Sequence, residues 1–368
     1  MKINKLTLKN FRNYDAQSIE FSPDVNVICG ENAQGKTNLL EAIVYLSCGK
    51  SPRARSDREM ILFGEEEASL TGEISSRSRE FKTEIRLAAG KRRKISVNGV
   101  NIKRAGELSG VLNTVYFCPE DLFLIREGAA ARRRFMDSAL SQLRPRYADA
   151  LAEYNRLYEH KTRILRDSEE HPDLLATLPD FNLRMAQFGA VLIHYRARFC
   201  ERLAQYAASA HRECSGGREE LTLTYETVKT VSDPFASQET LFAQLMEHQK
   251  AHEQAELASR LCLSGAHKDD IAVEIAGQNA RAFSSQGQTR TAALALKLAE
   301  REIYREITGE VPVLLLDDVL SELDPRRQEF VLNRITGGQV FITCCEEDRL
   351  EALLGGKILR VENGCVRE

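Results

Sequence analysis

The chain has 368 residues, of which 43% are hydrophobic and 29% are charged. That length predicts roughly two to three domains of about 150 residues each, with enough apolar material for folded cores. The 51 lysines and arginines nearly balance the 54 aspartates and glutamates, leaving a net charge of −3, so a histone-like polycation is excluded. No apolar run approaches the about 20 residues that a membrane helix needs, and the first residues form a strand-like pattern without an apolar leader. The nine cysteines include no Cys-x-x-Cys pair, so we expect a soluble cytoplasmic protein with reduced thiols.

The first hundred residues predict a mixed α/β region. Short strand patterns occur at 3–9, 19–22, 25–29, 81–87 and 94–97. Gly90 and Asn98-Gly99 are turn signals between the later strands. One amphipathic helix is expected at 36–48, where leucine, isoleucine and valine recur at helical spacing.

Residues 121–262 have a different pattern, that of long polar helices, of which 147–165 is the most regular. Helix breakers interrupt this region at Pro145, Pro172, Pro179, Gly216-Gly217 and Pro234. A long coiled coil requires an unbroken heptad pattern, so we expect a compact helical lobe instead. After Gly265 strand patterns return, followed by a helix at 287–307 and apolar strands at 313–316 and 340–343. The apolar run at 313–316 does not alternate, which fits a parallel sheet that is covered on both faces.

A phosphate-binding loop is predicted between the strand at 25–29 and the helix at 36–48. The segment Gly30-Glu31-Asn32-Ala33-Gln34-Gly35-Lys36-Thr37 matches G-x-x-x-x-G-K-[ST] in the strand–loop–helix context that gives this motif its meaning. The two glycines let backbone N–H groups and the helix N-terminus face phosphates. Lys36 is expected to bridge the outer phosphates, and the Thr37 hydroxyl to ligate Mg²⁺.

A second carboxylate site is predicted at Asp317-Asp318, directly after the buried strand at 313–316. The carboxyl ends of strands are where α/β sheets bind ligands. We expect Asp317 to hold Mg²⁺ and Asp318 to be the general base for an attacking water. Asp324 is expected to cap a helix at 326–335 whose first residue follows Pro325.

The segment Ser284-Ser285-Gln286-Gly287-Gln288 opens the helix at 287–307 and resembles the signature sequence of ABC-type ATPases. A helix N-terminus with a hydroxyl at Ser285 and a glycine backbone at Gly287 can approach a γ-phosphate, with Gln288 beside them. The chain's own phosphate loop already has its own helix. The phosphate that this segment contacts is therefore expected on another subunit.

Further motifs lie along the whole chain: Asn10-Phe11-Arg12-Asn13-Tyr14, Pro119-Glu120-Asp121-Leu122, Arg132-Arg133-Arg134-Phe135-x-Asp137, Gly265-x-His267-Lys268-Asp269-Asp270 and Ser285-Gln286-Gly287-Gln288-x-Arg290. With the nucleotide motifs they resemble the RecF family, bacterial recombination and repair ATPases related to the SMC proteins. The resemblance implies an ABC-type ATPase head with a mixed sheet, built from 1–118 and 266–368, and an inserted helical lobe at 119–265. It also implies that Arg12 and Asn13 belong to the nucleotide site.

The resemblance implies a function as well. A RecF-type protein binds ATP with Mg²⁺, forms an ATP-dependent homodimer, binds single- and double-stranded DNA without sequence preference, and works with RecR and RecO to load RecA at gapped DNA. A role in replication and the SOS response goes with this. The ATPase is expected to be weak, stimulated by DNA and used as a switch.

Some positions depart from the wider ABC pattern. Asp318 stands where most such ATPases have the longer glutamate, which predicts slow hydrolysis. The segment Cys344-Cys345-Glu346 occupies the place of the usual switch histidine, and Cys118-Pro119-Glu120 that of a common glutamine. Neither role can be assigned, and His267 is expected to be structural.

Three basic clusters could contact DNA phosphates: Lys91-Arg92-Arg93-Lys94, Arg132-Arg133-Arg134 and Arg326-Arg327. The first is the best candidate, because it edges a hairpin and contains no acidic residue. The arginine triplet opens a helix, where the dipole disfavours cations, and so requires an anionic partner such as nucleotide, DNA or a local carboxylate.

Other functions remain open at this point. A small-molecule phosphotransferase could use the same loop, but the signature segment and the absence of a recognisable acceptor lid count against it. An architectural chromosome ATPase would need a long coiled-coil arm. A transporter subunit fits poorly with the helical insert.

Overall fold

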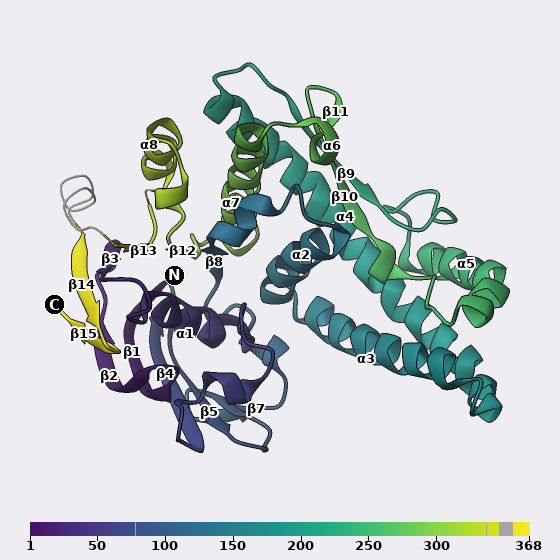
Figure 1. The fold of residues 1–368 in the computed structure, drawn as a ribbon, viewed down its shortest axis with the longest axis horizontal. Coiled ribbons are helices and arrows are strands. Elements are labelled where there is room, and N and C mark those ends of the chain that lie inside the picture. Colours follow the sequence, from purple (N-terminus) through teal and green to yellow (C-terminus); the bar gives the residue numbers. More distant parts are fainter. Residues whose placement is uncertain (78, 336, 346–355) are drawn as a thin grey trace. The chain divides into compact units, whose positions relative to one another are not determined.

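The computed structural model describes residues 1–77, 79–335, 337–345 and 356–368 (Figure 1). The chain forms two compact units, one made of Met1–Leu122 with Lys297–Glu368 and the other of Phe123–Leu296. The mixed α/β architecture predicted from the sequence is confirmed. The proposed head of 1–118 and 266–368 and lobe of 119–265 stay a prediction, and the second compact unit also includes 266–296.

The first unit contains an antiparallel sheet in the order β2-β1-β4-β5-β6-β7. Its strands are β1 (Lys2–Phe11), β2 (Tyr14–Glu20), β4 (Glu67–Ser75), β5 (Glu80–Ala88), β6 (Lys94–Val97) and β7 (Val100–Ile102). The predicted turn at Asn98-Gly99 joins β6 to β7, and both residues have positive φ, as a two-residue hairpin turn requires. The sequence patterns did not predict β4, which pairs with both β1 and β5.

The second sheet of the first unit runs in the order β15-β14-β3-β13-β12-β8. Its strands are β3 (Val25–Cys29), β8 (Thr114–Phe117), β12 (Val313–Leu316), β13 (Val340–Cys344), β14 (Lys357–Glu362) and β15 (Cys365–Arg367). All pairs are parallel except β14 with β15. Since β3, β12 and β13 are parallel neighbours in register, their carboxyl ends meet at one edge of the sheet.

Helix α1 (Lys36–Cys48) packs against strands of both sheets, and residues from all three elements form one apolar core. Ten of its thirteen residues are buried. A helix that is buried on every side lacks a solvent face. The sequence pattern predicted an amphipathic helix here, and this was wrong because strands of both sheets pack against the helix and bury it.

The remaining elements of the first unit are shorter. They are η1 (Asp57–Met60), η2 (Ala105–Leu108), η6 (Leu320–Glu322) and α8 (Pro325–Arg334). Asp324 caps α8 by accepting a hydrogen bond from Arg327 N, as predicted. Two elements cross from one unit to the other, η3 (Pro119–Phe123) and α7 (Gln286–Thr308).

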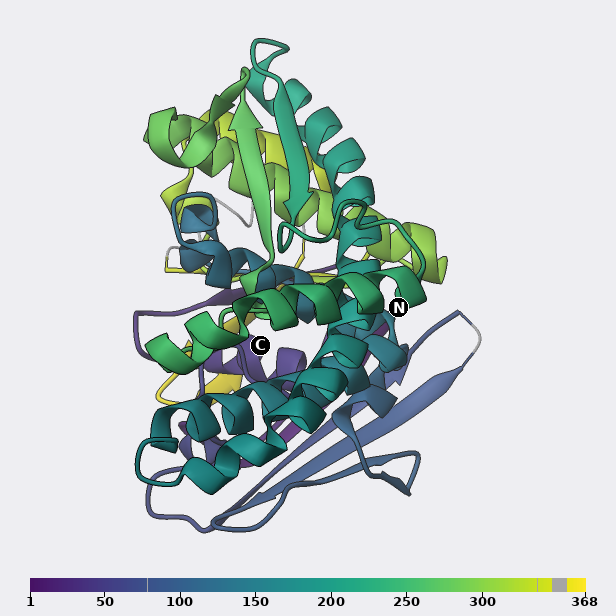
Figure 2. The same ribbon diagram turned by 90° about the vertical axis from the view of Figure 1, so that its right-hand side faces the viewer.

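The second unit is mainly helical. Its elements are α2 (Ala129–Leu143), α3 (Pro145–Asp167), η4 (Pro172–Thr177), α4 (Leu178–Ser215), β9 (Leu221–Glu226), α5 (Gln238–Ser259), η5 (Ala266–Lys268), β10 (Asp270–Ile275), β11 (Gln278–Asn279) and α6 (Ala280–Phe283). Helix α4 packs on α3, α5 and β9, and β10 pairs with β9 (Figure 2). Pro145 and Pro179 lie in the first turns of α3 and α4, where proline is tolerated. They therefore mark the starts of separate helices, as the predicted interruptions of the helical region require. The small sheet β11-β10-β9 was not predicted.

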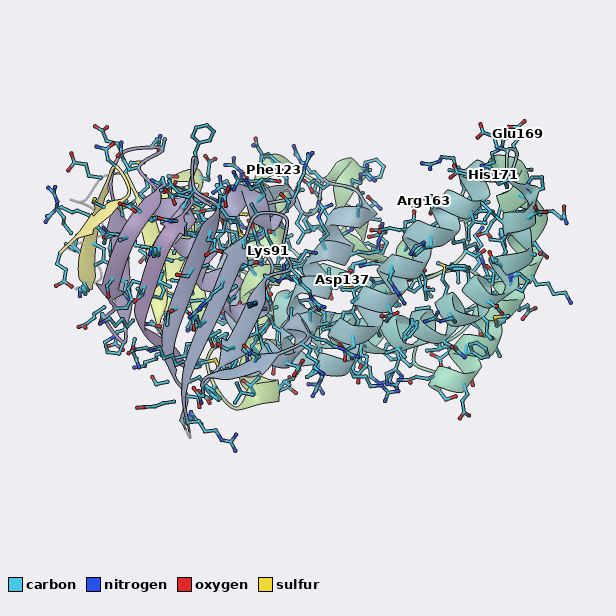
Figure 3. The ribbon with its side chains drawn as sticks, turned by 90° about the horizontal axis from the view of Figure 1, so that it is seen from below. Lys91, Phe123, Asp137, Arg163, Glu169 and His171 are labelled. Carbon is cyan, nitrogen blue, oxygen red and sulfur yellow. The ribbon has the colours of Figure 1, made fainter. Side chains whose placement is uncertain are left out.

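A buried ionic network holds the second unit together. Arg196 on α4 donates to Asp137 Oδ1 at 2.8 Å and to Asp269 Oδ2 at 2.7 Å. Asp137 lies on α2 (Figure 3). Asp269 is fully buried and also accepts hydrogen bonds from Tyr225 and Thr227. One arginine therefore joins three segments that are far apart in the sequence.

The arginine triplet belongs to the same part of the unit. Arg132 donates to both carboxylate oxygens of Asp270, at 2.7 and 2.8 Å, and Arg133 donates to the Asp269 carbonyl. The anionic partner of Arg132 is thus a local carboxylate, one of the predicted alternatives. His267 is held between Tyr154 and the Cys262 carbonyl, and burial lowers its pKa to about 4. These contacts fit the structural role expected of it, which stays a prediction.

We predict that Arg196→Met destabilises the second unit by about 3–5 kcal/mol, because it leaves two carboxylates without their cation. Urea unfolding followed by circular dichroism measures this. Arg156→Met is the matched control on α3, where the pair with Glu153 is exposed; its cost should stay below about 1 kcal/mol. Equal costs for both variants would contradict the network's role.

Candidate nucleotide-binding site

The predicted phosphate loop lies between β3 and α1, and α1 begins at Lys36. A Cβ atom on Gly30 would lie 2.3 Å from the Val361 carbonyl oxygen, so only glycine permits this approach of the two backbones. The loop therefore starts directly against a strand of the parallel sheet. Its N–H groups continue into the N-terminus of a helix, which is the arrangement that binds phosphate.

Lys36 is 4% exposed, and its ammonium lies over the loop itself. Nζ donates to the carbonyls of Gly30 at 2.6 Å and of Glu31 at 3.1 Å. The Cys345 thiol lies 3.5 Å away and contacts Asn32. These contacts hold the cation within the loop, where outer phosphates would be expected.

Thr37 and Asp317 meet at the base of the site. The Thr37 hydroxyl donates to Asp317 Oδ1 at 3.0 Å, and the Tyr116 hydroxyl donates to Asp317 Oδ2 at 2.7 Å. Burial raises the pKa of the Asp317 carboxyl, and the hydrogen bonds from Tyr116, Thr37 and Thr343 partly oppose this. A cation bound beside this carboxylate would stabilise its charged form and oppose the effect of burial.

These two oxygen donors fit Mg²⁺. Oxygens at adjacent corners of a magnesium octahedron, each about 2.1 Å from the ion, lie about 3.0 Å apart, and the Thr37 and Asp317 oxygens are 3.0 Å apart. Within the described parts of the chain no group of three or more His, Cys, Asp or Glu could hold a metal. Mg²⁺ commonly uses one or two protein ligands together with phosphates and water, so one hydroxyl and one carboxylate suffice.

Asp318 adopts a left-handed backbone conformation with φ of 52°. Its N–H donates to Thr343 Oγ1 at 2.7 Å, and that oxygen lies 3.1 Å from Asp317 Oδ1 and 3.3 Å from Asp318 Oδ1. An aspartate with positive φ costs free energy, and such strain concentrates at functional sites. Thr343 therefore holds the two carboxylates in one arrangement.

Arg12 and Asn13 form the two-residue turn between β1 and β2, and Asn13 contacts the loop. Asn13 Nδ2 donates to the Gln34 carbonyl at 2.8 Å. Arg12 makes a bidentate pair with the buried Glu41 of α1, at 2.8 Å for each contact. Asn13 thus contacts the loop directly, and the predicted contact of Arg12 with nucleotide stays a prediction.

The signature residues lie at the start of α7 and form a helix cap. Ser285 is exposed; its Oγ accepts from Gln288 N at 3.2 Å, and its N–H donates to Gln288 Oε1 at 2.8 Å. Gln288 also donates to Glu219. Gly287 lies within the first turn. An ordinary capping box is therefore present, and contact with a partner's phosphate stays a prediction.

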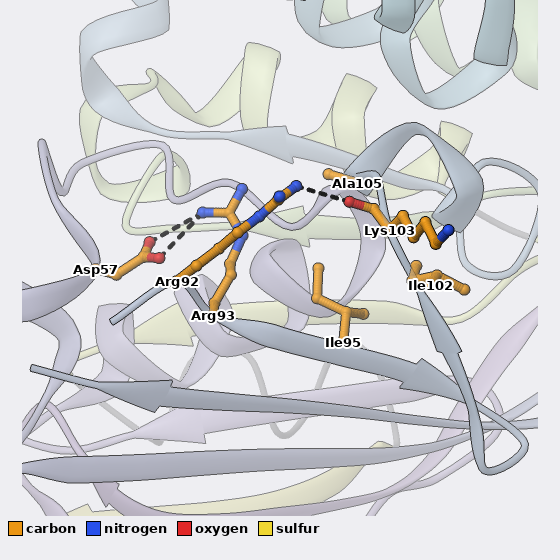
Figure 4. A pocket seen from close by; sticks show the side chains of 7 residues that line it. All are labelled: Asp57, Arg92, Arg93, Ile95, Ile102, Lys103 and Ala105. Carbon is orange, nitrogen blue, oxygen red and sulfur yellow. Dashed lines mark hydrogen bonds and ion pairs between the residues drawn. The ribbon is translucent and has the colours of Figure 1, made fainter. Parts of the chain in front are cut away.

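The basic cluster at 91–94 borders β6. Lys91 and Lys94 are exposed, whereas Arg93 pairs with Asp57 at 3.0 Å and Arg92 donates to the Lys103 carbonyl at 2.8 Å (Figure 4). A pocket of about 250 Å³ lies here; it is lined by Asp57, Arg92, Arg93, Ile95, Ile102, Lys103 and Ala105. The structure thus brings a cationic hollow to this edge of the first unit.

Sequence reasoning missed Tyr116 and Thr343, which both contact Asp317. Thr343 follows Ile342, the residue paired with Leu316, so it lies beside Asp317 once β12 and β13 are neighbours. A hydroxyl at the end of a second apolar strand was the available signal. Tyr116 had no comparable signal, because its contact depends on β8 being the other neighbour of β12. Glu346 lies outside the described residues.

A phosphate loop after a parallel strand, with a buried carboxylate ending the next strand but one, is the arrangement of an ABC-type ATPase head, the fold that this chain shares with RecF and Smc head structures. The RecF/RecN/SMC N terminal domain family model matches residues 2–364. The chain belongs to the RecF family.

Relatives and solved structures support this assignment. The chain is 37% identical to the DNA replication and repair protein RecF of Clostridium acetobutylicum, over all of both chains, and 39% identical to that of Agathobacter rectalis, over 94% and 92%. A structure of the recombination mediator protein RecF-ATPrS in the RecFOR pathway matches with a TM-score of 0.91 at 34% identity, over 99% and 97% of the chains. The Smc head domain of Pyrococcus furiosus shares the fold, with a TM-score of 0.57 at 17% identity over 99% and 95%. Among the described residues, none of the helices combines the length and the apolar composition that a membrane span requires.

We predict that Tyr116→Phe weakens Mg²⁺-dependent nucleotide binding about tenfold, because a hydrogen bond to a charged group contributes roughly 1.5–3 kcal/mol and this one orients Asp317. Binding without Mg²⁺ should hardly change. Titration of a fluorescent ATP analogue with and without Mg²⁺ measures both. Tyr45→Phe is the control, since it removes a similar bond to Asp57, a carboxylate that contacts neither Thr37 nor Asp317; a similar loss there would contradict the prediction.

Proposed function

We propose that this chain binds ATP with Mg²⁺ at residues 30–37 and acts as a DNA-binding recombination mediator. One observation carries the proposal: the Thr37 hydroxyl and the Asp317 carboxylate lie 3.0 Å apart below a phosphate loop that holds Lys36. The relatives described as RecF-ATPrS and RecF-ATP support ATP as the nucleotide.

In this proposal the residues of the site have separate roles. Lys36 binds the outer phosphates, and Thr37 and Asp317 hold the metal, which when bound neutralises charge on those phosphates. Asp318 orients or deprotonates the attacking water. Its side chain is one methylene shorter than glutamate and its backbone is constrained by Thr343. A slow ATPase that serves as a switch follows.

The active species in this proposal is a homodimer formed with ATP. Ser285 and Gly287 open α7, and Ser285 is exposed at that helix N-terminus. The positive end of the helix dipole attracts phosphate, and the loop of the same chain already has α1 for this purpose. We therefore assign Ser285, Gly287 and Gln288 to the phosphate that the partner subunit binds.

We predict that Ser285→Arg folds and binds ATP with nearly normal affinity, but neither dimerises with ATP nor hydrolyses it. A long cation would block the face on which the partner's phosphate is expected, and the residues of the subunit's own loop are unchanged. Light scattering with and without ATP measures dimerisation, and phosphate release measures turnover.

Mixing provides the sharper test. Lys36→Arg alone should be inactive, because the larger planar guanidinium does not fit the space beside the Gly30 and Glu31 carbonyls that the lysine ammonium occupies. A mixed dimer of Ser285→Arg with Lys36→Arg keeps one site that has an intact Lys36 and an intact Ser285, so partial ATPase activity should return. If Ser285→Arg alone dimerises and hydrolyses ATP like the wild type, the arrangement in trans is wrong and a phosphotransferase becomes the better explanation.

The DNA surface is assigned to Lys91, Arg92 and Lys94, with Arg93 as a support. In the other two basic clusters, Arg132 and Arg327 are engaged by local carboxylates. Backbone phosphates are the natural partners of exposed cations, which makes binding independent of sequence. With RecR and RecO, the protein would load RecA at gapped DNA in the cytoplasm, in repair, replication and SOS induction.

We predict that replacing Lys91, Arg92 and Lys94 by alanine flattens the salt dependence of DNA binding. Each lost phosphate contact reduces the slope of log K against log [salt] by about 0.9, so the change should approach 2.7. The control replaces Arg156, Arg163 and Arg166, three exposed cations on α3, which changes the net charge equally. Fluorescence anisotropy from 50 to 200 mM salt, taken as about the working range, measures both slopes. An unchanged slope in the first variant would move the surface elsewhere.

A further inference from the structure

We propose that the C-terminal hairpin of β14 and β15 is a clamp on the phosphate loop, and that Asn363 and Gly364 are positioning residues for nucleotide binding. The inference rests on the proposed function, since it concerns the same loop. The turn of this hairpin lies against the middle of the loop, although the two segments are more than 300 residues apart in the sequence.

The hairpin turn makes two hydrogen bonds to one residue of the loop. The Gly364 N–H donates to the Gln34 carbonyl at 3.1 Å, and the Asn363 N–H donates to Gln34 Oε1 at 2.6 Å. The same carbonyl also accepts from Asn13 Nδ2 at 2.8 Å. Gln34 is thus held by backbone from the end of the chain and by a side chain from its beginning.

Holding this carbonyl orients the next amide. In a trans peptide the C=O and N–H groups point in opposite directions. Because the Gln34 carbonyl faces the hairpin, the Gly35 N–H points away from it. The Tyr14 hydroxyl donates to the Gly35 carbonyl at 2.9 Å, which orients the Lys36 N–H in the same manner. Successive N–H groups aimed to one side form the concavity that binds phosphate.

The contact has no room for a side chain. Gly364 has φ of 72°, and a Cβ atom there would lie 2.0 Å from the Asn13 carbonyl oxygen. The opposing atom is backbone, so it cannot move aside without shifting the turn that carries Asn13. A methyl group at 364 would push the hairpin away from the loop.

The hairpin is itself anchored. Strand β14 pairs in parallel with β3, from Lys357 beside Asn26 to Arg360 beside Cys29, and Val366 N donates to Gln17 Oε1 at 3.0 Å. The clamp is therefore fixed to the strand that leads into the loop. It fits a role in pre-organising the loop before nucleotide arrives.

The chain contains a matched control turn. Asn98-Gly99 joins β6 to β7 with φ values of 50° and 79°, close to the 49° and 72° of Asn363-Gly364. A Cβ atom on Gly99 meets nothing within 4 Å. Gly99→Ala therefore carries the same backbone penalty as Gly364→Ala without the clash.

The test compares Gly364→Ala, Gly99→Ala and wild type in two measurements. In the nucleotide-free protein, hydrogen exchange of peptides covering 30–37 should be faster in Gly364→Ala only, with α3 unchanged. With Mg²⁺ and a fluorescent ATP analogue, Gly364→Ala should raise Kd at least tenfold, and Gly99→Ala less than twofold. The ATPase KM should rise in parallel while kcat stays within twofold, because Asp317 and Asp318 do not contact the hairpin.

Gln34→Met gives a milder variant, in case Gly364→Ala does not fold. It removes the acceptor for Asn363 N and no backbone contact, and should raise Kd about threefold. The clamp is overturned if loop exchange in Gly364→Ala matches wild type, or if Gly99→Ala changes loop exchange and Kd equally. If loop exchange responds as expected but wild-type protein binds no ATP, the clamp stands and the proposed function fails.

Discussion

The parallel pairing of β3, β13 and β12 is the constraint on which the rest of the site depends. These strands come from residues 25–29, 340–344 and 313–316, and only their alignment brings Thr37, Thr343 and Asp317 to one sheet edge. The resulting contacts of 3.0 and 3.1 Å join groups that are about 280 and 26 residues apart. A shift of one residue in the pairing of β12 with β13 would turn the Thr343 side chain to the face away from Asp317.

Local chemistry decided how much of this the sequence could predict. The helix at 36–48 and the strand at 313–316 were predicted at their observed bounds, because loop glycines and a run of apolar residues mark them. The burial of α1 on all sides could not be predicted, since it depends on a second sheet that packs on it. Tyr116 was missed for the same reason: its hydroxyl reaches Asp317 only because β8 and β12 pair.

The motifs shared along the chain do not all serve one purpose. Arg132, Asp137 and Asp269 are engaged in buried ion pairs of the second unit, where they fix α2 and α4 to the segment before β10. Removing any one of them leaves a partner charge uncompensated, which is costly. Such residues tolerate little change even though they belong to the other unit and not to the one that contains the loop.

The placement of the C-terminal hairpin also has a consequence for biosynthesis. The loop at 30–37 is made early, whereas the strands that flank β3, at 340–344 and 357–362, and the turn at 363–364 are synthesised more than 300 residues later. At about 5–20 residues per second, ribosomes take on the order of tens of seconds to cover that interval. During that time β3 has no parallel neighbours, and the nascent chain exposes an unpaired apolar strand. Completion of the nucleotide site is thus coupled to the synthesis of residues 340–364, and a chain that is cut short before β14 would retain the loop sequence without its support.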